Sequence, residues 1–448
     1  MRILQVVQGL PPESLGGTEM YVAHLSRELL QRGHDVRVFS RIVDTCRSQY
    51  SVDAVFMEGI PVTRINNAFG QLERFSRSYT NPEVARRFGD FLDIFSPQVV
   101  HFHHLMYLST TCIQEATRRK IPVVLTLHDY WLICQRGRFL KPDLSVCPGQ
   151  TDEGCARCFA HLLDSNLVSV YRKLKPMLGA RSWLKDRLRH LHGRYIAFRR
   201  PSVHACEQIR QRMVHVREIC REVDLFLAPS RFLREQFLAF GIPANKILYL
   251  ECGLPPQETI AMKRTGAHAP PIFAYIGVMD AVKGVHLLVE AFQGITNAEL
   301  RLYGGEADYA AYPDRQRFLN QIDRSPHIRL MGRYENHEIG NILSQVDVVV
   351  VPSIWYENAP LVIREAFQAR KPVITADLGG MREAVHDEVT GLLFQPRQVE
   401  DLRRKINRFV ADPGLVDRLA YNIPPIKSMA ENAKELEAEY QVLCNRTS

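Results

Sequence analysis

Short apolar segments of β-forming residues alternate with segments of helical periodicity along most of the chain, and the alternation occurs twice. In the first half, residues 3–7, 36–39, 99–102 and 123–127 have the length and composition of buried strands. Alternation of this kind predicts a parallel sheet with helices on both faces. At roughly 100–200 residues per domain, 448 residues accommodate two such units with sizeable cores.

The pattern restarts after a segment rich in Gly and Pro. The strands expected in the second half are residues 272–276, 300–303, 328–330, 346–351 and 373–375, with a helix at 285–292. We therefore predict an N-terminal domain at 1–252, a linker at 253–271, a C-terminal domain at 272–425 and a solvent-facing closing helix within 426–448. A ligand of two doubly wound domains is expected in the cleft at the carboxyl ends of both sheets.

The net charge of +8 comes from one segment. Residues 171–221 contain 14 Lys/Arg and 3 Asp/Glu, a balance of +11, which leaves −3 for the rest of the chain. Because aromatic and aliphatic residues are interleaved with these charges, the segment predicts a helix on an anionic membrane surface. The alternative is a solvated charged helix. A nucleic-acid partner is not expected, because no motif supports one.

The hydrophobic runs are too short for a signal peptide or a membrane span, which needs about 18 apolar residues. We expect a cytoplasmic protein, peripheral on the inner face of the cell membrane. Its ten cysteines are then mostly reduced thiols.

Four cysteines fall within 25 residues, as an insert at 134–158. Cys134, Cys147, Cys155 and Cys158 have the spacing C-x12-C-x7-C-x2-C. Four thiolates in one loop are suited to bind a structural zinc ion or, less favoured, an iron–sulfur cluster. The alternative is a set of free thiols in an irregular loop, because only the last pair has standard spacing.

A carboxylate-rich motif follows the all-apolar strand at 348–351. Asn358 is a plausible N-cap and Pro360 suits the first helical turn, so a helix is expected to begin just after Glu357. The free N–H groups of its first turn favour an anion such as a diphosphate. Glu357 and Glu365 are suited to accept hydrogen bonds from the hydroxyls of a sugar and a ribose.

These residues resemble a known family. The second half contains Gly277…Lys283-Gly284, Leu330-Met-Gly-Arg333-Tyr, Pro352-Ser353, Glu357-x7-Glu365, Leu378-Gly-Gly380 and Val389-Thr-Gly-Leu-Leu-Phe394; the first half adds Gly16-Gly17, His128 and Ser230. Together they resemble the family 4 glycosyltransferases, the retaining GT-B group. The resemblance implies two Rossmann-like domains facing a central cleft and a UDP- or GDP-linked sugar as donor.

The resemblance also implies roles for residues. Glu365 would hold the ribose hydroxyls, Glu357 the transferred sugar and Lys283 the diphosphate, while His128 would lie near the transferred sugar and the acceptor. The predicted catalytic residues are His128, Glu357 and Lys283. The predicted donor-binding residues are Gly16, Gly17, Ser230, Arg231, Lys283, Arg333, Glu357, Asn358, Ala359, Pro360, Leu361 and Glu365.

One position departs from the family pattern. An Arg that often binds the diphosphate is replaced here, because the sequence reads Gly277-Val278-Met279. Arg231 and Arg333 are candidates to compensate, although each is equally well explained as a surface arginine. No Asp-x-Asp pair is present, which favours transfer without a metal ion.

The sequence therefore predicts a hexosyltransferase that moves a sugar from a nucleotide donor to a lipid-linked or polysaccharide acceptor in cell-envelope or exopolysaccharide synthesis. Two alternatives stay open. One is another GT-B enzyme, such as a sugar-nucleotide epimerase or, less favoured, a phosphorylase. The other is a non-catalytic scaffold or sugar-nucleotide-binding protein, which the missing arginine slightly favours.

Overall fold

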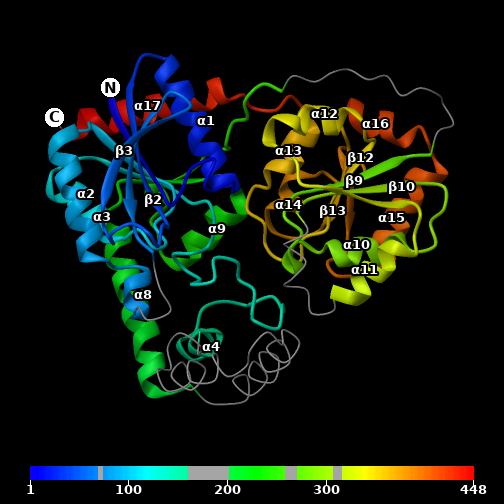
Figure 1. Cartoon of the computed structure of the whole chain (residues 1–448), viewed down its shortest axis with the longest axis horizontal. Coiled ribbons are helices and arrows are strands. Elements are labelled where there is room, and N and C mark those ends of the chain that lie inside the picture. The colour runs from blue at the N-terminus through cyan, green and yellow to red at the C-terminus, as the bar shows by residue number, and fades with distance from the viewer. Residues whose placement is uncertain (69–73, 160–200, 258–269, 306–314, 448) are drawn as a thin grey trace. The chain divides into compact units, whose positions relative to one another are not determined.

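A computed structural model of the chain describes residues 1–68, 74–159, 201–257, 270–305 and 315–447, drawn in colour in Figure 1. The chain forms two compact units. The first contains Met1–Ala228, Phe237–Leu248 and Glu435–Ser448, and the second contains Pro229–Gln236 and Tyr249–Lys434.

The first unit contains an eight-stranded sheet in the order β3-β4-β2-β1-β5-β6-β7-β8. Strands β1, β2, β5, β6 and β7 run parallel, while β3 and β4 form an antiparallel hairpin whose second strand is parallel to β2. The strands are β1 (Arg2–Val7), β2 (Asp35–Ile42), β3 (Val52–Met57), β4 (Ile60–Asn66), β5 (Val99–Phe102), β6 (Val123–Thr126), β7 (Leu225–Ala228) and β8 (Ile247–Tyr249). The central strands are buried on both faces, as expected for a parallel sheet covered by helices.

The helices of this part of the chain begin where the sequence supplies caps. Asn81 accepts backbone hydrogen bonds at the start of one helix, and Pro82 occupies its first turn. The helices are α1 (Gly17–Gln31), η1 (Phe75–Ser78), α2 (Pro82–Phe95), α3 (Thr111–Arg118), α4 (Asp152–Cys158), α8 (Val203–Glu222), α9 (Arg231–Phe240) and η2 (Ala244–Lys246).

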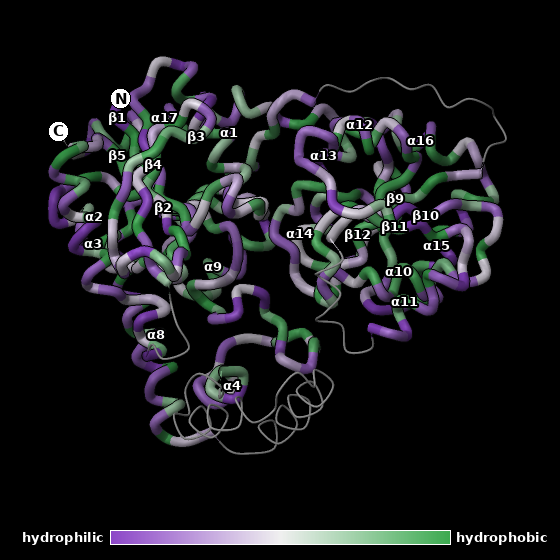
Figure 2. The backbone as a smooth tube through the Cα atoms, in the orientation of Figure 1, coloured by the Kyte–Doolittle hydropathy of each residue, from purple (hydrophilic) through white to green (hydrophobic). Residues whose placement is uncertain are grey.

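The second unit contains a six-stranded sheet in the order β11-β10-β9-β12-β13-β14, and all its neighbouring strands are parallel. Its strands are β9 (Ile272–Ile276), β10 (Glu299–Tyr303), β11 (Ile328–Gly332), β12 (Val348–Val351), β13 (Val373–Ala376) and β14 (Gly391–Phe394). Its helices are η3 (Ala281–Lys283), α10 (Val285–Phe292), α11 (Arg315–Asp323), η5 (Asn336–Glu338), α12 (Ile339–Ser344), α13 (Leu361–Gln368), α14 (Gly379–Ala384), α15 (Val399–Ala411) and α16 (Leu415–Tyr421). Figure 2 shows apolar residues along the strands of both sheets. The predicted fold class of two doubly wound α/β units is confirmed.

The last helix, α17 (Met429–Thr447), differs from its prediction as a solvent-facing element. Ala433, Leu436 and Tyr440 are fully buried. The Tyr440 hydroxyl is 2.6 Å from Nδ1 of His101 on β5, so this helix contributes to the core of the first unit. In the part of the chain that the structure describes, no helix is both long and apolar enough to cross a membrane.

Candidate functional site

A partly buried ion pair lies at the carboxyl edge of the second sheet. Lys283 Nζ donates to Oε1 of Glu357 at 2.7 Å, and the hydroxyl of Ser353 donates to the same oxygen at 2.7 Å. Glu357 is only 6% exposed. Among the described residues, its second oxygen has no hydrogen-bond partner. The structure thus brings together two of the predicted catalytic residues, and it adds Ser353, which the sequence analysis had placed only within a motif.

The position of Lys283 follows from local backbone geometry. Lys283 ends η3, whose first turn is capped by the side chain of Asp280. Gly284 follows with φ of +72°, and a Cβ there would lie 2.0 Å from the carbonyl oxygen of Pro352. Only glycine permits this close approach between η3 and the loop after β12. A backbone hydrogen bond from Ile354 to Val282 joins the same two segments.

The loop that carries Glu357 is held against α14. The amide of Gly380 donates to the carbonyl of Glu357, and a Cβ on Gly380 would lie 1.6 Å from the carbonyl oxygen of Asn358. The prediction that Asn358 caps the next helix is wrong, because α13 begins at Leu361 with Pro360 in the cap position. Asn358 instead accepts a 2.6 Å hydrogen bond from the hydroxyl of Ser230. The side-chain oxygen of Asn358 is thus bonded to Ser230 in the loop before α13.

Glu365 lies one turn into α13 and is partly buried. Burial raises the pKa of its carboxyl to about 7. Burial raises the pKa of the Tyr334 phenol, and the nearby charge of Glu365 raises it further. In the described part of the chain no hydrogen bond to the Glu365 side chain is formed. This carboxyl group is thus available to a ligand and changes its charge near neutral pH.

The other residues predicted to bind the donor are spread around the second unit. Arg231 places its guanidinium 4.4 Å from the centre of the Tyr249 ring, and its backbone amide donates to Glu383. Arg333 is exposed beside Gly305. Ala359, Pro360 and Leu361 form the approach to α13. Among the described residues, neither arginine forms an ion pair or hydrogen bond with the side chain of Lys283 or Glu357.

In the first unit, His128 follows β6 and joins a chain of buried polar groups. Its Nε2 lies 3.0 Å from Nδ1 of His103, whose Nε2 lies 2.6 Å from Oε1 of Gln5. Burial lowers the pKa of His103 well below its ordinary value and that of His128 to about 3, so both rings are neutral near pH 7. Since the Gln5 oxygen accepts from His103, the Nδ1 of His103 accepts in turn from Nε2–H of His128. His103 and Gln5 were not predicted from the sequence.

Neighbouring residues complete this edge of the first sheet. Gly16 caps α1, and a Cβ there would lie 2.4 Å from the carboxylate of Glu19. Glu19 is buried and accepts hydrogen bonds from Gln8 and Ser14. Gly16 and Gly17 therefore lie at the start of the first helix, at the same sheet edge as His128.

The four clustered cysteines lie near one another. Cys155 and Cys158 are on α4, three residues apart. Burial raises the pKa of Cys155 to about 12, and the charges of Cys134, Cys158 and Cys147 act in the same direction, which places the four thiols within electrostatic range. Within the described ranges, however, no three His, Cys, Asp or Glu side chains are placed to share a metal ion.

The basic segment is described only in its C-terminal part. Residues 203–222 form α8, where Ile209, Met213 and Val216 are buried, so this part packs into the first unit. Arg212 is 1% exposed and donates to the carbonyls of Trp131 and Leu132. The remaining residues, 171–200, lie outside the described residues.

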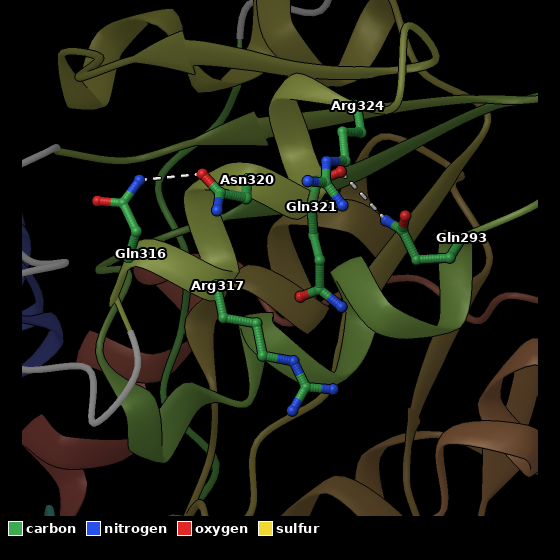
Figure 3. A pocket seen from close by; sticks show the side chains of 6 residues that line it. All are labelled: Gln293, Gln316, Arg317, Asn320, Gln321 and Arg324. Carbon is green, nitrogen blue, oxygen red and sulfur yellow. Dashed lines mark hydrogen bonds between the residues drawn. The ribbon is translucent and has the colours of Figure 1, made fainter.

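One cavity of the second unit, of about 480 Å³, lies away from these groups. Figure 3 shows its lining on α11 and at the end of α10, with Gln293 bonded to the Gln321 carbonyl and Gln316 to Asn320. None of the predicted site residues lines it.

Two family models match the chain. "Glycosyl transferase 4-like domain" matches residues 16–150, and "Glycosyl transferases group 1" matches residues 257–424. Three curated relatives are 25–28% identical to the chain over the matched residues. Alpha-D-kanosaminyltransferase of Streptomyces kanamyceticus is 28% identical over 37% of this chain and 42% of the relative, less than half of its length. A glycogen synthase of Mycobacterium tuberculosis is 25% identical over 94% of this chain and 88% of the relative. The amylovoran biosynthesis glycosyltransferase AmsK of Erwinia amylovora is 25% identical over 38% of this chain and 43% of the relative.

Solved structures share the fold. Sucrose-phosphate synthase from Thermosynechococcus elongatus has a TM-score of 0.66 at 20% identity and covers 99% of both chains. Anabaena HepE in complex with UDP and glucose has a TM-score of 0.61 at 16% identity, over 99% of this chain and 100% of the other.

The chain thus has the GT-B fold of the glycosyltransferases. It belongs to the group 1, or family 4, glycosyltransferases, which are retaining enzymes that use nucleotide-sugar donors.

Proposed function

We propose that the second unit binds the nucleotide-sugar donor through the Lys283–Glu357 pair. The observation that carries this proposal is the 2.7 Å contact of Lys283 with a buried carboxylate, held by two glycines that tolerate no side chain. Lys283 provides a fixed positive charge for the leaving diphosphate, where preorganised charge is most effective. This charge takes the place of a divalent cation, so we expect transfer to continue in the presence of a chelator.

The two glutamates have different proposed roles. One oxygen of Glu357 is occupied by Lys283 and Ser353, and its second oxygen accepts hydroxyls of the transferred sugar. Glu365 accepts the ribose hydroxyls of a UDP- or GDP-linked donor when it is ionised. The HepE structure, which contains UDP and glucose, supports a uridine nucleotide as the first donor to try.

We assign His128 to the transferred sugar and the acceptor. Its ring is neutral and is oriented by its hydrogen bond to His103, so a sugar hydroxyl meets it as a polar group rather than as a charge. It therefore orients the sugar and does not compete with Lys283 for the diphosphate.

The acceptor that we propose is lipid-linked or a growing polysaccharide, in cell-envelope or exopolysaccharide synthesis at the inner face of the membrane. The likeness to AmsK, which acts in amylovoran biosynthesis, supports a polysaccharide pathway. The positive balance of residues 171–221 supports an anionic surface as the place of reaction.

Structural zinc on Cys134, Cys147, Cys155 and Cys158 stays a proposal. The proposal is supported by the spacing of the four cysteines and by their electrostatic proximity. Binding of the ion would have to bring the thiols closer together than they lie in the structure. Elemental analysis of the purified protein tests it. We expect one zinc per chain and loss of the metal when Cys155 and Cys158 are both replaced by Ser; four alkylatable thiols without metal would refute it.

The catalytic proposal is tested by Lys283→Ala and Glu357→Gln. We expect each to reduce transfer from UDP- or GDP-sugars by about 10²–10³-fold, because each removes a preorganised charged group. The control is Glu388→Gln, which alters an exposed carboxylate paired with Arg408 on the same unit. Release of nucleoside diphosphate is measured alongside thermal unfolding. Unchanged pathway output in cells that carry Lys283→Ala would favour a non-catalytic scaffold.

A further inference from the structure

A second cavity, of about 510 Å³, lies in the first unit. Its lining includes Gln8 after β1, Arg41 on β2, Arg64 on β4 and Tyr107 after β5. Because these strands are parallel neighbours, the cavity lies toward the same sheet edge as His128, which follows β6. Its volume is that of a small-ligand site.

Arg41 is the distinctive charge of this cavity. Its Nε donates to the carbonyl of Asn67 at 2.7 Å, and its guanidinium carbon lies 5.0 Å from the centre of the Tyr107 ring. No carboxylate within the described ranges forms an ion pair with it. A partly buried guanidinium without a counter-ion is unfavourable unless a ligand completes it.

The other two arginines of the lining differ, because carboxylates already neutralise them. Arg64 pairs with Asp53 at 2.6 Å and with Glu13 at 2.8 Å. Arg47 pairs with Asp53 at 2.7 Å and with Asp44 at 3.1 Å. Arg41 therefore provides the uncompensated charge of the lining.

The groups around Arg41 are held rigidly. Tyr107 has φ of +60°, which is unfavourable for an aromatic residue. Its amide donates to Ser78, and its carbonyl accepts from the Asn67 side chain at 2.6 Å. Asn67 is 1% exposed, and its backbone carbonyl is the group that accepts from Arg41. Buried Asn67 thus holds both the guanidinium of Arg41 and the backbone of Tyr107 in place.

We propose that this cavity binds the acceptor and that the acceptor has an acidic group, a phosphate or a carboxylate, which Arg41 binds. The inference rests on the proposed transfer function and specifies its second substrate. The guanidinium has donors left to make charge-assisted hydrogen bonds to an oxyanion. Gln8, Glu13 and Asp44 line the same space and are suited to neighbouring hydroxyls. The acceptor is therefore an acidic sugar or a sugar phosphate rather than a neutral sugar.

Calorimetric titration of the full chain tests this proposal with three probes: glucose 6-phosphate, glucuronate and glucose. We expect a charged probe to bind more tightly than glucose, and the two charged probes distinguish phosphate from carboxylate. Arg41→Gln should weaken that binding by about 10- to 100-fold, the usual effect of losing charge-assisted hydrogen bonds. Arg41→Lys should restore part of it.

Arg37→Gln is the matched control, because Arg37 lies on the same strand with its guanidinium 4.5 Å from the Phe95 ring. It should bind the probes as the wild type does. Equal binding of all three probes, binding by neither charged probe at millimolar concentration, or an Arg41→Gln protein that binds like the wild type would each overturn the proposal. Titration of the same samples with UDP and GDP examines donor binding separately, so the two proposals can fail independently.

Discussion

The two units position their candidate residues by opposite electrostatic means. In the second unit a charged pair, Lys283 with Glu357, is locked between loops whose glycines allow almost no space. In the first unit, His128 is bonded to His103, and burial keeps both rings neutral. Fixed charge suits a diphosphate that gains charge as it departs. Neutral polarity suits hydroxyls, which need direction rather than charge.

A substitution that disturbs the close backbone packing in the second unit should reduce the transfer rate most. In Gly380→Ala the new Cβ would overlap the Asn358 carbonyl, so the Glu357 loop must move. A displacement of about 1 Å at a catalytic group costs about 100-fold in rate, and we expect at least this loss. Gly414→Ala is the control, because its Cβ would contact only the ends of two surface side chains, Arg418 and Asp412. Turnover at saturating donor measures the effect; wild-type turnover in Gly380→Ala would show that close packing of the loop is dispensable.

A smaller reduction of the transfer rate is expected when the hydrogen bond between His103 and His128 in the first unit is removed. His103→Ala leaves His128 without the acceptor that orients it, and we expect kcat to fall about tenfold with little change in donor KM. His103→Asn should recover part of the rate, because an amide can both donate and accept. Exposed His337 provides the control substitution to Ala. In Glu365→Gln, which lacks the carboxyl group with a pKa of about 7, a kcat that still titrates with an imidazole pKa between pH 5 and 8 would contradict a neutral role for His103 and His128.

The mildest test concerns Glu365, the carboxyl group with a pKa of about 7. Because only the ionised form accepts from both ribose hydroxyls, UDP or GDP should bind several-fold more tightly at pH 8 than at pH 6. Glu365→Gln should bind weakly at both.

The same shift has a consequence for stability. The folded state holds this proton more tightly than the unfolded chain, so the stability contributed by Glu365 decreases as pH rises from about 4.5 to 7. Glu365→Gln should raise Tm by about 2–4 °C at pH 8 and not at pH 4.5. Equal Tm changes at both values would argue against the raised pKa.

Much of the fold could be predicted because its strands are apolar on both faces. The prediction of 285–292 as a helix agrees with α10, and β12 was recognisable as a run of four valines. The hairpin β3–β4 was not predicted. Its first strand lies at the edge of the sheet and exposes the apolar Val52 and Phe56, so its burial does not follow its composition. The prediction of Asn358 as a helix cap was wrong. Its side chain is bonded to Ser230, a residue distant in sequence, which the local pattern does not indicate.

The candidate site could be predicted residue by residue but not as an arrangement. Lys283 and Glu357 were both named from the sequence, yet their contact depends on Gly284 lying against Pro352. His103 was not named, although it directly follows β5, because its position after a strand does not by itself distinguish a positioning group from a core residue.

Helix α17 has a consequence for biosynthesis. Its residues from Glu435 onward belong to the unit formed mainly by the first 228 residues, where Tyr440 meets the buried His101. Domains generally fold in the order in which the ribosome releases them. Here the first unit is complete only when α17 has been translated, because Leu436 and Tyr440 are fully buried and the Tyr440 hydroxyl bonds to His101. A nascent chain stalled before Tyr440 should therefore expose a protease-sensitive first unit even though its whole sheet has been synthesised.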